Sequence, residues 1–127
     1  MKLLAYEVDK RSFLGIFNED ETWVYPISAA GMEYRSMKDL IREAGPSEME
    51  MLDYISKKAP GDVTGAAPVE EIKIVSPIPE PDQDIICLGI NYMDHAKESA
   101  RFEKREFERP EKAIYFSKRV NRTNDPD

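Results

Sequence analysis

The chain has 127 residues, of which 41% are hydrophobic and 34% are charged, and its formal net charge is −7 at pH 7. This length holds one domain or two very small ones, and the apolar fraction excludes a chain that is disordered throughout. The acidic excess would repel a phosphate backbone, so we expect no nucleic-acid partner. No apolar run approaches the ~20 residues that cross a bilayer, so we expect no membrane partner. A lone cysteine, Cys87, is typical of a cytoplasmic protein.

The first part of the chain favours strands. Leu4, Tyr6 and Val8 alternate along the chain with Leu3, Ala5 and Glu7. Similar runs, rich in β-branched and aromatic residues, follow at 13–17 and 22–27. Polar connectors at 9–11 and 18–21 separate the three runs and are short enough for hairpins. The sequence therefore predicts an antiparallel meander of about three strands.

Two short helices are predicted next. The first begins after Ser36, a suitable N-cap, and its apolar stripe has helical spacing: Met37, Leu40, Ile41 and Ala44. The second is predicted to begin at Ser47, which would form a capping box with Glu50. Its expected buried stripe consists of Met51, Leu52, Ile55 and Ala59.

A proline-rich stretch follows and marks the clearest boundary in the chain. Four prolines lie between residues 66 and 84, with one short strand expected around 72–75. We place a domain junction there. The predicted fold class is α+β, with an N-terminal domain of antiparallel strands and two short helices over 1–76 and a second domain over 77–127.

The second domain is predicted to contain two strands and a helix. Residues 84–90 are apolar on both faces, which predicts a strand buried on both sides, with Cys87 as a small buried residue rather than a reactive thiol. A short helix is expected over 91–100, a charged run follows at 101–112, and a last strand is expected at 113–117.

His95 and Glu98 form the strongest candidate for chemistry. On a helix, residues three apart share a face, so the carboxylate can accept a hydrogen bond from one imidazole nitrogen and leave the other free. Such a pair can act as a general base that activates water. The alternative from spacing alone is an ordinary ion pair on a helix surface.

The stretch 89–98 resembles the Gly-x-Asn-Tyr-x-x-His-x-x-Glu signature of the fumarylacetoacetate hydrolase (FAH) superfamily. The prolines at 76–81 are similar to the entry to that family's catalytic domain. Residues 113–118 are similar to its strand that ends in an active-site lysine. Residues 1–76 match the variable N-terminal domain of the family more weakly.

The resemblance implies an enzyme that acts on 2-oxo or 1,3-dicarbonyl acids by C–C hydrolysis, decarboxylation, isomerisation or hydration. It implies that His95 and Glu98 form the catalytic dyad and that Lys118 contacts substrate, although Lys118 is otherwise interpretable as a solvated lysine at a strand end. It also implies a magnesium or manganese ion in the complete enzyme. The expected fold of the second domain is the beginning of a mixed β-roll, and we expect a homodimer.

The family's metal ligands, an Asp and two Glu on later strands, are implied to lie beyond residue 127. Glu48 and Glu50 have a Glu-x-Glu spacing, but they lie at the start of a predicted helix. Asp125 and Asp127 flank a proline in a predicted loop. We therefore expect no metal site in this chain. We expect the chain to be the N-terminal part of an enzyme and to be inactive by itself. The alternative is an autonomous packing or interaction module over 1–76 with a disordered C-terminal stub.

Overall fold

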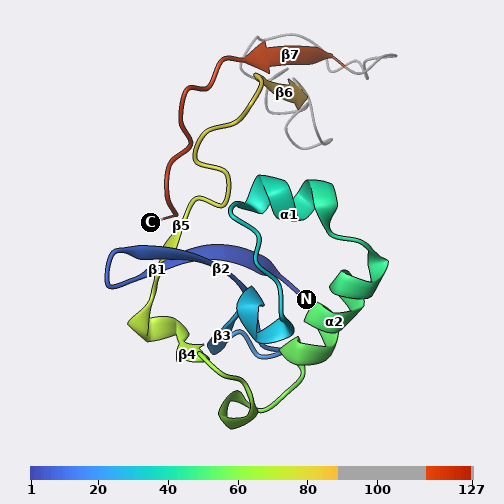
Figure 1. Cartoon of the computed structure of the whole chain (residues 1–127). Coiled ribbons are helices and arrows are strands. Elements are labelled where there is room, and N and C mark those ends of the chain that lie inside the picture. The colour runs from blue at the N-terminus through green and yellow to red at the C-terminus, as the bar shows by residue number, and fades with distance from the viewer. Residues whose placement is uncertain (89–113, 127) are drawn as a thin grey trace, which may run out of the picture. The chain divides into compact units, whose positions relative to one another are not determined.

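A computed structural model describes residues 1–88 and 114–126 of the chain (Figure 1). The chain divides into two units, Met1–Pro79 with Thr123–Asp127, and Glu80–Arg122. The domain limits predicted from the sequence, 1–76 and 77–127, stay a prediction.

The first unit is built on a five-stranded antiparallel sheet in the order β4-β3-β2-β1-β5. Its strands are β1 (Leu3–Val8), β2 (Arg11–Phe17), β3 (Trp23–Pro26), β4 (Ala67–Pro68) and β5 (Lys73–Val75). The predicted meander corresponds to β1, β2 and β3, and the short strand predicted around 72–75 is β5. Strand β4, which pairs with β3, was not predicted from the sequence. It has only two residues, too few to show an alternation of apolar and polar side chains.

Tight turns join the first three strands. Asp9 and Lys10 both have positive φ, at 50° and 63°, as a two-residue turn between antiparallel strands requires. In the next connector the Asn18 side chain accepts hydrogen bonds from the backbone N–H groups of Thr22 and Trp23, at 3.0 and 2.9 Å. These local contacts within the turns help to set the register of the strands that they join.

The helices of the first unit are α1 (Met37–Glu43) and α2 (Pro46–Ser56), with single turns η1 (Ile27–Ala30), η2 (Pro60–Asp62) and η3 (Val69–Glu71). Ser36 caps α1 as predicted, because its hydroxyl accepts from the Asp39 N–H at 3.1 Å. The predicted Ser47 cap is wrong. Helix α2 begins earlier, at Pro46, since a proline loses no hydrogen bond at the first helical position.

The two faces of the sheet have separate apolar cores. Alternate residues of β2 and β3 direct Ile16 and Tyr25 toward η1, α1 and α2, where they pack with Leu40 and Leu52. The opposite face holds a smaller cluster of Leu4, Tyr6 and Val24. Figure 1 shows α2 beside η1, which returns the chain from β3 to the helical layer.

The predicted helical stripes are only partly correct. Leu40, Leu52 and Ile55 are buried, but Ile41 is 61% exposed and Met51 is 47% exposed. Residues at the margin of each predicted stripe are therefore in solvent.

The second unit contains β6 (Ile85–Leu88) and β7 (Tyr115–Lys118), which pair as an antiparallel two-stranded sheet. Both strands were predicted. The helix expected over 91–100 and the charged run at 101–112 lie outside the described residues.

Candidate functional site

Of the three predicted site residues, the structure describes Lys118. It is the last residue of β7, it is exposed, and it pairs with Ile85 at the start of β6. His95 and Glu98 lie outside the described residues. Their assignment as the dyad stays a prediction.

The β6–β7 hairpin is largely exposed, which corrects the expectation of a strand buried on both sides. Ile86 is 74% exposed and Tyr115 is 65% exposed. Cys87 is half-buried rather than buried, and its sulfur lies 3.9 Å from the Ile85 carbonyl oxygen. A strand is buried on both faces only when a layer of structure packs against each face. The described residues supply this hairpin with no such layer.

The carboxylate of Glu48 forms a helix cap. One oxygen accepts a hydrogen bond from the Tyr34 hydroxyl, and the other accepts from the Gly45 N–H at 2.8 Å. The bond to Tyr34 lowers the pKa of Glu48 and raises that of Tyr34 to about 12. Both oxygens of Glu48 are therefore engaged in hydrogen bonds within the first unit.

The carboxylate of Asp125 is also fully engaged, within the first unit. One oxygen accepts a hydrogen bond from the Ser76 N–H at 2.9 Å. The other forms an ion pair with Lys73, whose Nζ lies 2.9 Å away. This contact joins the last described residues of the chain to β5 and the residue after it. The loop predicted for this region is therefore an anchored loop, with its acid used as a structural acceptor.

Thr123 completes the anchor. Its hydroxyl donates to the Ile78 carbonyl oxygen at 2.8 Å and is hydrogen-bonded to the Ser76 hydroxyl, and its N–H donates to the Pro79 carbonyl oxygen at 2.9 Å. We call the contacts of Ser76, Thr123 and Asp125 the polar latch. Sequence reasoning missed it, because two hydroxyls and a carboxylate far apart in the chain form no periodic or spaced pattern.

The described residues do not supply a ligand set for the divalent metal that the family implies. Among residues 1–88 and 114–126, no group of three or more His, Cys, Asp or Glu side chains could hold a metal ion. The two acids with tempting positions, Glu48 and Asp125, direct their oxygens at N–H, hydroxyl and ammonium donors. Asp127 lies outside the described residues.

Comparison with known proteins decides the family. No family model matches the chain. It is 40% identical to a protein of Bacillus subtilis (strain 168), oxaloacetate tautomerase YisK. The match covers 93% of this chain, so it includes the stretch 89–98, which lies far from both ends. The chain belongs to the FAH superfamily.

This superfamily member spans 41% of the length of the relative that it matches. Its α+β layout, with a curled antiparallel sheet and two helices, is compatible with part of an FAH-type protein. In the part of the chain that the structure describes, no helix is long and apolar enough to cross a membrane.

Proposed function

We propose that this chain is the N-terminal part of an FAH-superfamily enzyme that acts on 2-oxo or 1,3-dicarbonyl acids, with oxaloacetate as the first substrate to test. The observation that carries the proposal is the 40% identity to a protein named as an oxaloacetate tautomerase. The presence of the His95 and Glu98 pair within the matched stretch supports the same reaction class.

The chemistry follows from the residue types. The methylene group of oxaloacetate lies between the keto carbon and a carboxylate carbon. Keto–enol tautomerisation breaks one C–H bond of this methylene group and forms one O–H bond on the keto oxygen. A single base that shuttles a proton performs both steps. In the proposal His95 holds this proton and Glu98 orients the imidazole. Lys118, an exposed cation at the end of β7, binds a substrate carboxylate.

C–C hydrolysis and decarboxylation are the alternative reaction types for the same residues. C–C hydrolysis would use the same dyad to deprotonate water, and decarboxylation would release carbon dioxide from the bound acid. A magnesium or manganese cofactor belongs to the proposal for the complete enzyme, with ligands outside the described residues. A homodimer and a cytoplasmic location are likewise proposed from the superfamily and the composition.

The second candidate is a non-catalytic interaction module over 1–76 with a disordered stub. The polar latch argues against it, since Thr123 and Asp125 are bonded to Ser76 and Lys73 in the first unit. The pairing of β6 with β7 argues against it too. A stub that is disordered throughout would form neither.

The test is an enol-absorbance assay of oxaloacetate with the longer protein that contains this chain, supplied with magnesium or manganese. His95→Gln and Glu98→Gln are expected to lower kcat by at least ~100-fold, the range of general acid–base catalysis. Lys118→Met is expected to raise KM more than it lowers kcat. Glu70→Gln, an exposed acid on η3, is the matched control and should leave both constants unchanged.

The 127-residue chain is assayed in parallel and is expected to show no turnover above the metal alone. Turnover by this chain would contradict the dependence on further residues. Full activity of His95→Gln in the longer protein would overturn the assigned dyad.

A further inference from the structure

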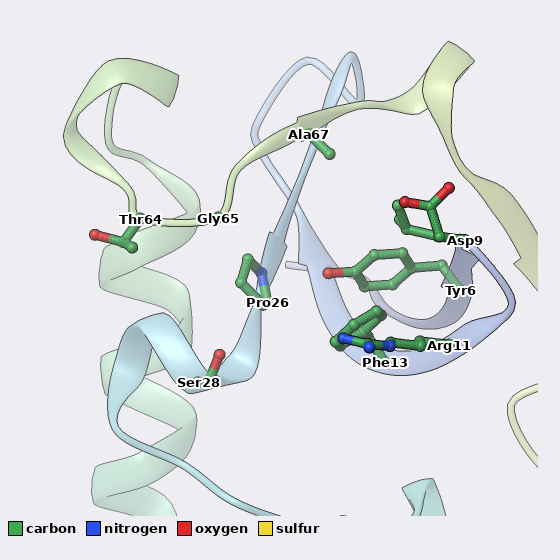
Figure 2. Close-up of a pocket in the computed structure, with 10 residues that line it drawn as sticks. Tyr6, Asp9, Arg11, Phe13, Pro26, Ser28, Thr64, Gly65 and Ala67 are labelled. Carbon is green, nitrogen blue, oxygen red and sulfur yellow. The ribbon is translucent and has the colours of Figure 1, made fainter.

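A pocket opens on the face of the sheet that α1 and α2 do not cover (Figure 2). Its volume is about 640 Å³, which is within the range of small-molecule sites. Side chains with polar ends line it beside an aromatic wall: Tyr6, Asp9, Arg11, Phe13, Ser28 and Thr64. All belong to the first unit, and none is a predicted catalytic residue.

Tyr6 is the most buried of these residues, at 3% exposed. Its ring stacks on Phe13 with centroids 5.6 Å apart and lies over Gly15, which leaves room for it. The Tyr6 hydroxyl has no hydrogen-bond partner among the described residues. Every fully buried side-chain oxygen in these residues does have a partner, so the Tyr6 hydroxyl oxygen is not fully buried. Because Tyr6 lines the pocket, this oxygen is accessible from it. Burial raises the pKa of Tyr6, so the hydroxyl keeps its proton and can donate.

Arg11 adds a cation to the same lining. Tyr6 pairs with Phe13 and Val8 pairs with Arg11, so all four residues lie on one face, and Arg11 is a diagonal neighbour of Tyr6. Figure 2 shows the Tyr6 and Arg11 side chains extending in the same direction, toward Pro26. In the described part of the chain, Arg11 forms no ion pair.

Asp9 adds a negative charge to the same lining, and it too has no partner among the described residues. Figure 2 shows its carboxylate on the other side of the Tyr6 ring from Arg11. A ligand with two negative groups would bring one of them near Asp9 and be repelled. The lining therefore favours one carboxylate, at the Arg11 end.

We propose that this pocket binds a small aromatic monocarboxylate, with the carboxylate on the Arg11 guanidinium and the Tyr6 hydroxyl and the ring against Phe13. A free aromatic acid and an aromatic amino acid share this chemistry, and in the second case Asp9 receives the ammonium group. The proposed ligand differs from the substrates of the proposed catalysis, which are acids with two carboxylates or two carbonyls.

The test is a titration of the isotope-labelled 127-residue chain with benzoate and with phenylalanine, followed by NMR amide shifts. Amides of β1 and β2 near Tyr6 and Arg11 are expected to shift and saturate. Arg11→Gln is expected to raise Kd by about tenfold, the usual loss for a charge-assisted bond, and Tyr6→Phe by several-fold. Arg35→Gln, an exposed arginine outside the lining, is the control and should leave Kd unchanged.

The two probes separate the two sources. Tighter binding of phenylalanine that Asp9→Asn abolishes assigns an amino acid, and equal binding of both assigns a free acid. Binding of inorganic phosphate as tight as that of benzoate would overturn the role of the aromatic wall. An absence of saturable shifts, or an unchanged Kd in Arg11→Gln with a native spectrum, would overturn the proposal.

Discussion

Gly15 lies in β2 at a point where three groups converge on the space above its backbone. A β-carbon there would lie 2.8 Å from Tyr6 Cε1, 2.9 Å from the Tyr25 carbonyl oxygen and 2.9 Å from Val24 Cγ1. One of these groups is backbone in a paired strand and cannot move without breaking the ladder. The glycine is needed for close packing, and its backbone conformation is ordinary.

Gly15→Ala is expected to lower the free energy of unfolding by about 1–3 kcal/mol, the usual cost of overpacking a well-packed site. Urea denaturation measures it. Gly61→Ala is the matched control, because a β-carbon at Gly61 meets nothing within 4 Å. Equal stability of the two variants would contradict the packing argument.

Tyr34 and Glu48 form a hydrogen bond whose strength depends on pH. The folded-state pKa of Glu48 is lowered below 4.5, so its contribution to stability is present above that value and is lost as pH falls through the folded pKa. The pKa of Tyr34 is raised to about 12, so its contribution is present below 10.0 and is lost as pH rises toward 12.

Tyr34→Phe removes this bond and leaves the Gly45 cap of α2. The stability difference between wild type and variant is expected to be largest at neutral pH and to shrink below pH 4.5 and above pH 10.0. Urea denaturation across this range checks it. A difference that is constant with pH would show that the two groups do not titrate together.

At the scale of elements, the polar latch is the contact that local sequence does not foreshadow. Within the first unit, it joins β5 and the residues up to Pro79 to the segment that begins at Thr123. Figure 1 shows the C-terminal end of the chain beside β5. Ser76 is only 6% exposed, so its hydroxyl depends on Thr123 for a partner.

Thr123→Val keeps the side-chain shape and removes the hydroxyl contacts to Ser76 and Ile78. The expected cost is about 1–3 kcal/mol, because a buried hydroxyl and a carbonyl oxygen lose a partner. Hydrogen exchange at Ser76 is expected to become faster while exchange in β1 and β2 is unchanged. Asn124→Ala, at an exposed neighbour, is the control. Unchanged exchange at Ser76 in Thr123→Val would contradict the latch.

The latch also explains one failure of sequence reasoning at this scale. Ser36 was readable as a cap because its partner, Asp39, is three residues away. The Ser76 and Asp125 contact spans 49 residues, and no short-range rule pairs them. The predicted start of α2 was wrong for a different reason. Ser47 and Glu50 have the spacing of a capping box, but the helix begins at Pro46, with Gly45 and Glu48 at the capping positions.

At the scale of the whole molecule, the β6–β7 hairpin carries an apolar surface that stable monomers seldom expose. Its large exposed residues are Ile85, Ile86, Leu88, Ile114, Tyr115 and Phe116. The outer edges of β6 and β7 have no partner strand among the described residues, and such edges beside an apolar surface favour pairing with a second copy. The 127-residue chain is therefore expected to self-associate.

Ile86→Lys is expected to weaken that association, because Ile86 is 74% exposed and a charge there opposes burial. Light scattering over a concentration series gives the mass. Ile41→Lys, at a 61% exposed position on α1, is the control and should leave the mass unchanged. A wild-type chain that is monomeric at every concentration would contradict the expectation.

The sequence by itself determined the α+β class, the first three strands, α1 with its Ser36 cap, and the superfamily, through the signature around His95 and Glu98. These features depend on spacing within a few residues, and short-range periodicity and backbone chemistry are visible in a linear chain. The tertiary structure decided the rest. It showed Tyr25 fully buried and Ile41 exposed, it engaged Asp125 in the polar latch, and it opened a pocket beside Tyr6. Those outcomes depend on which distant surfaces meet, and that is set by packing and by the pairing of buried polar groups.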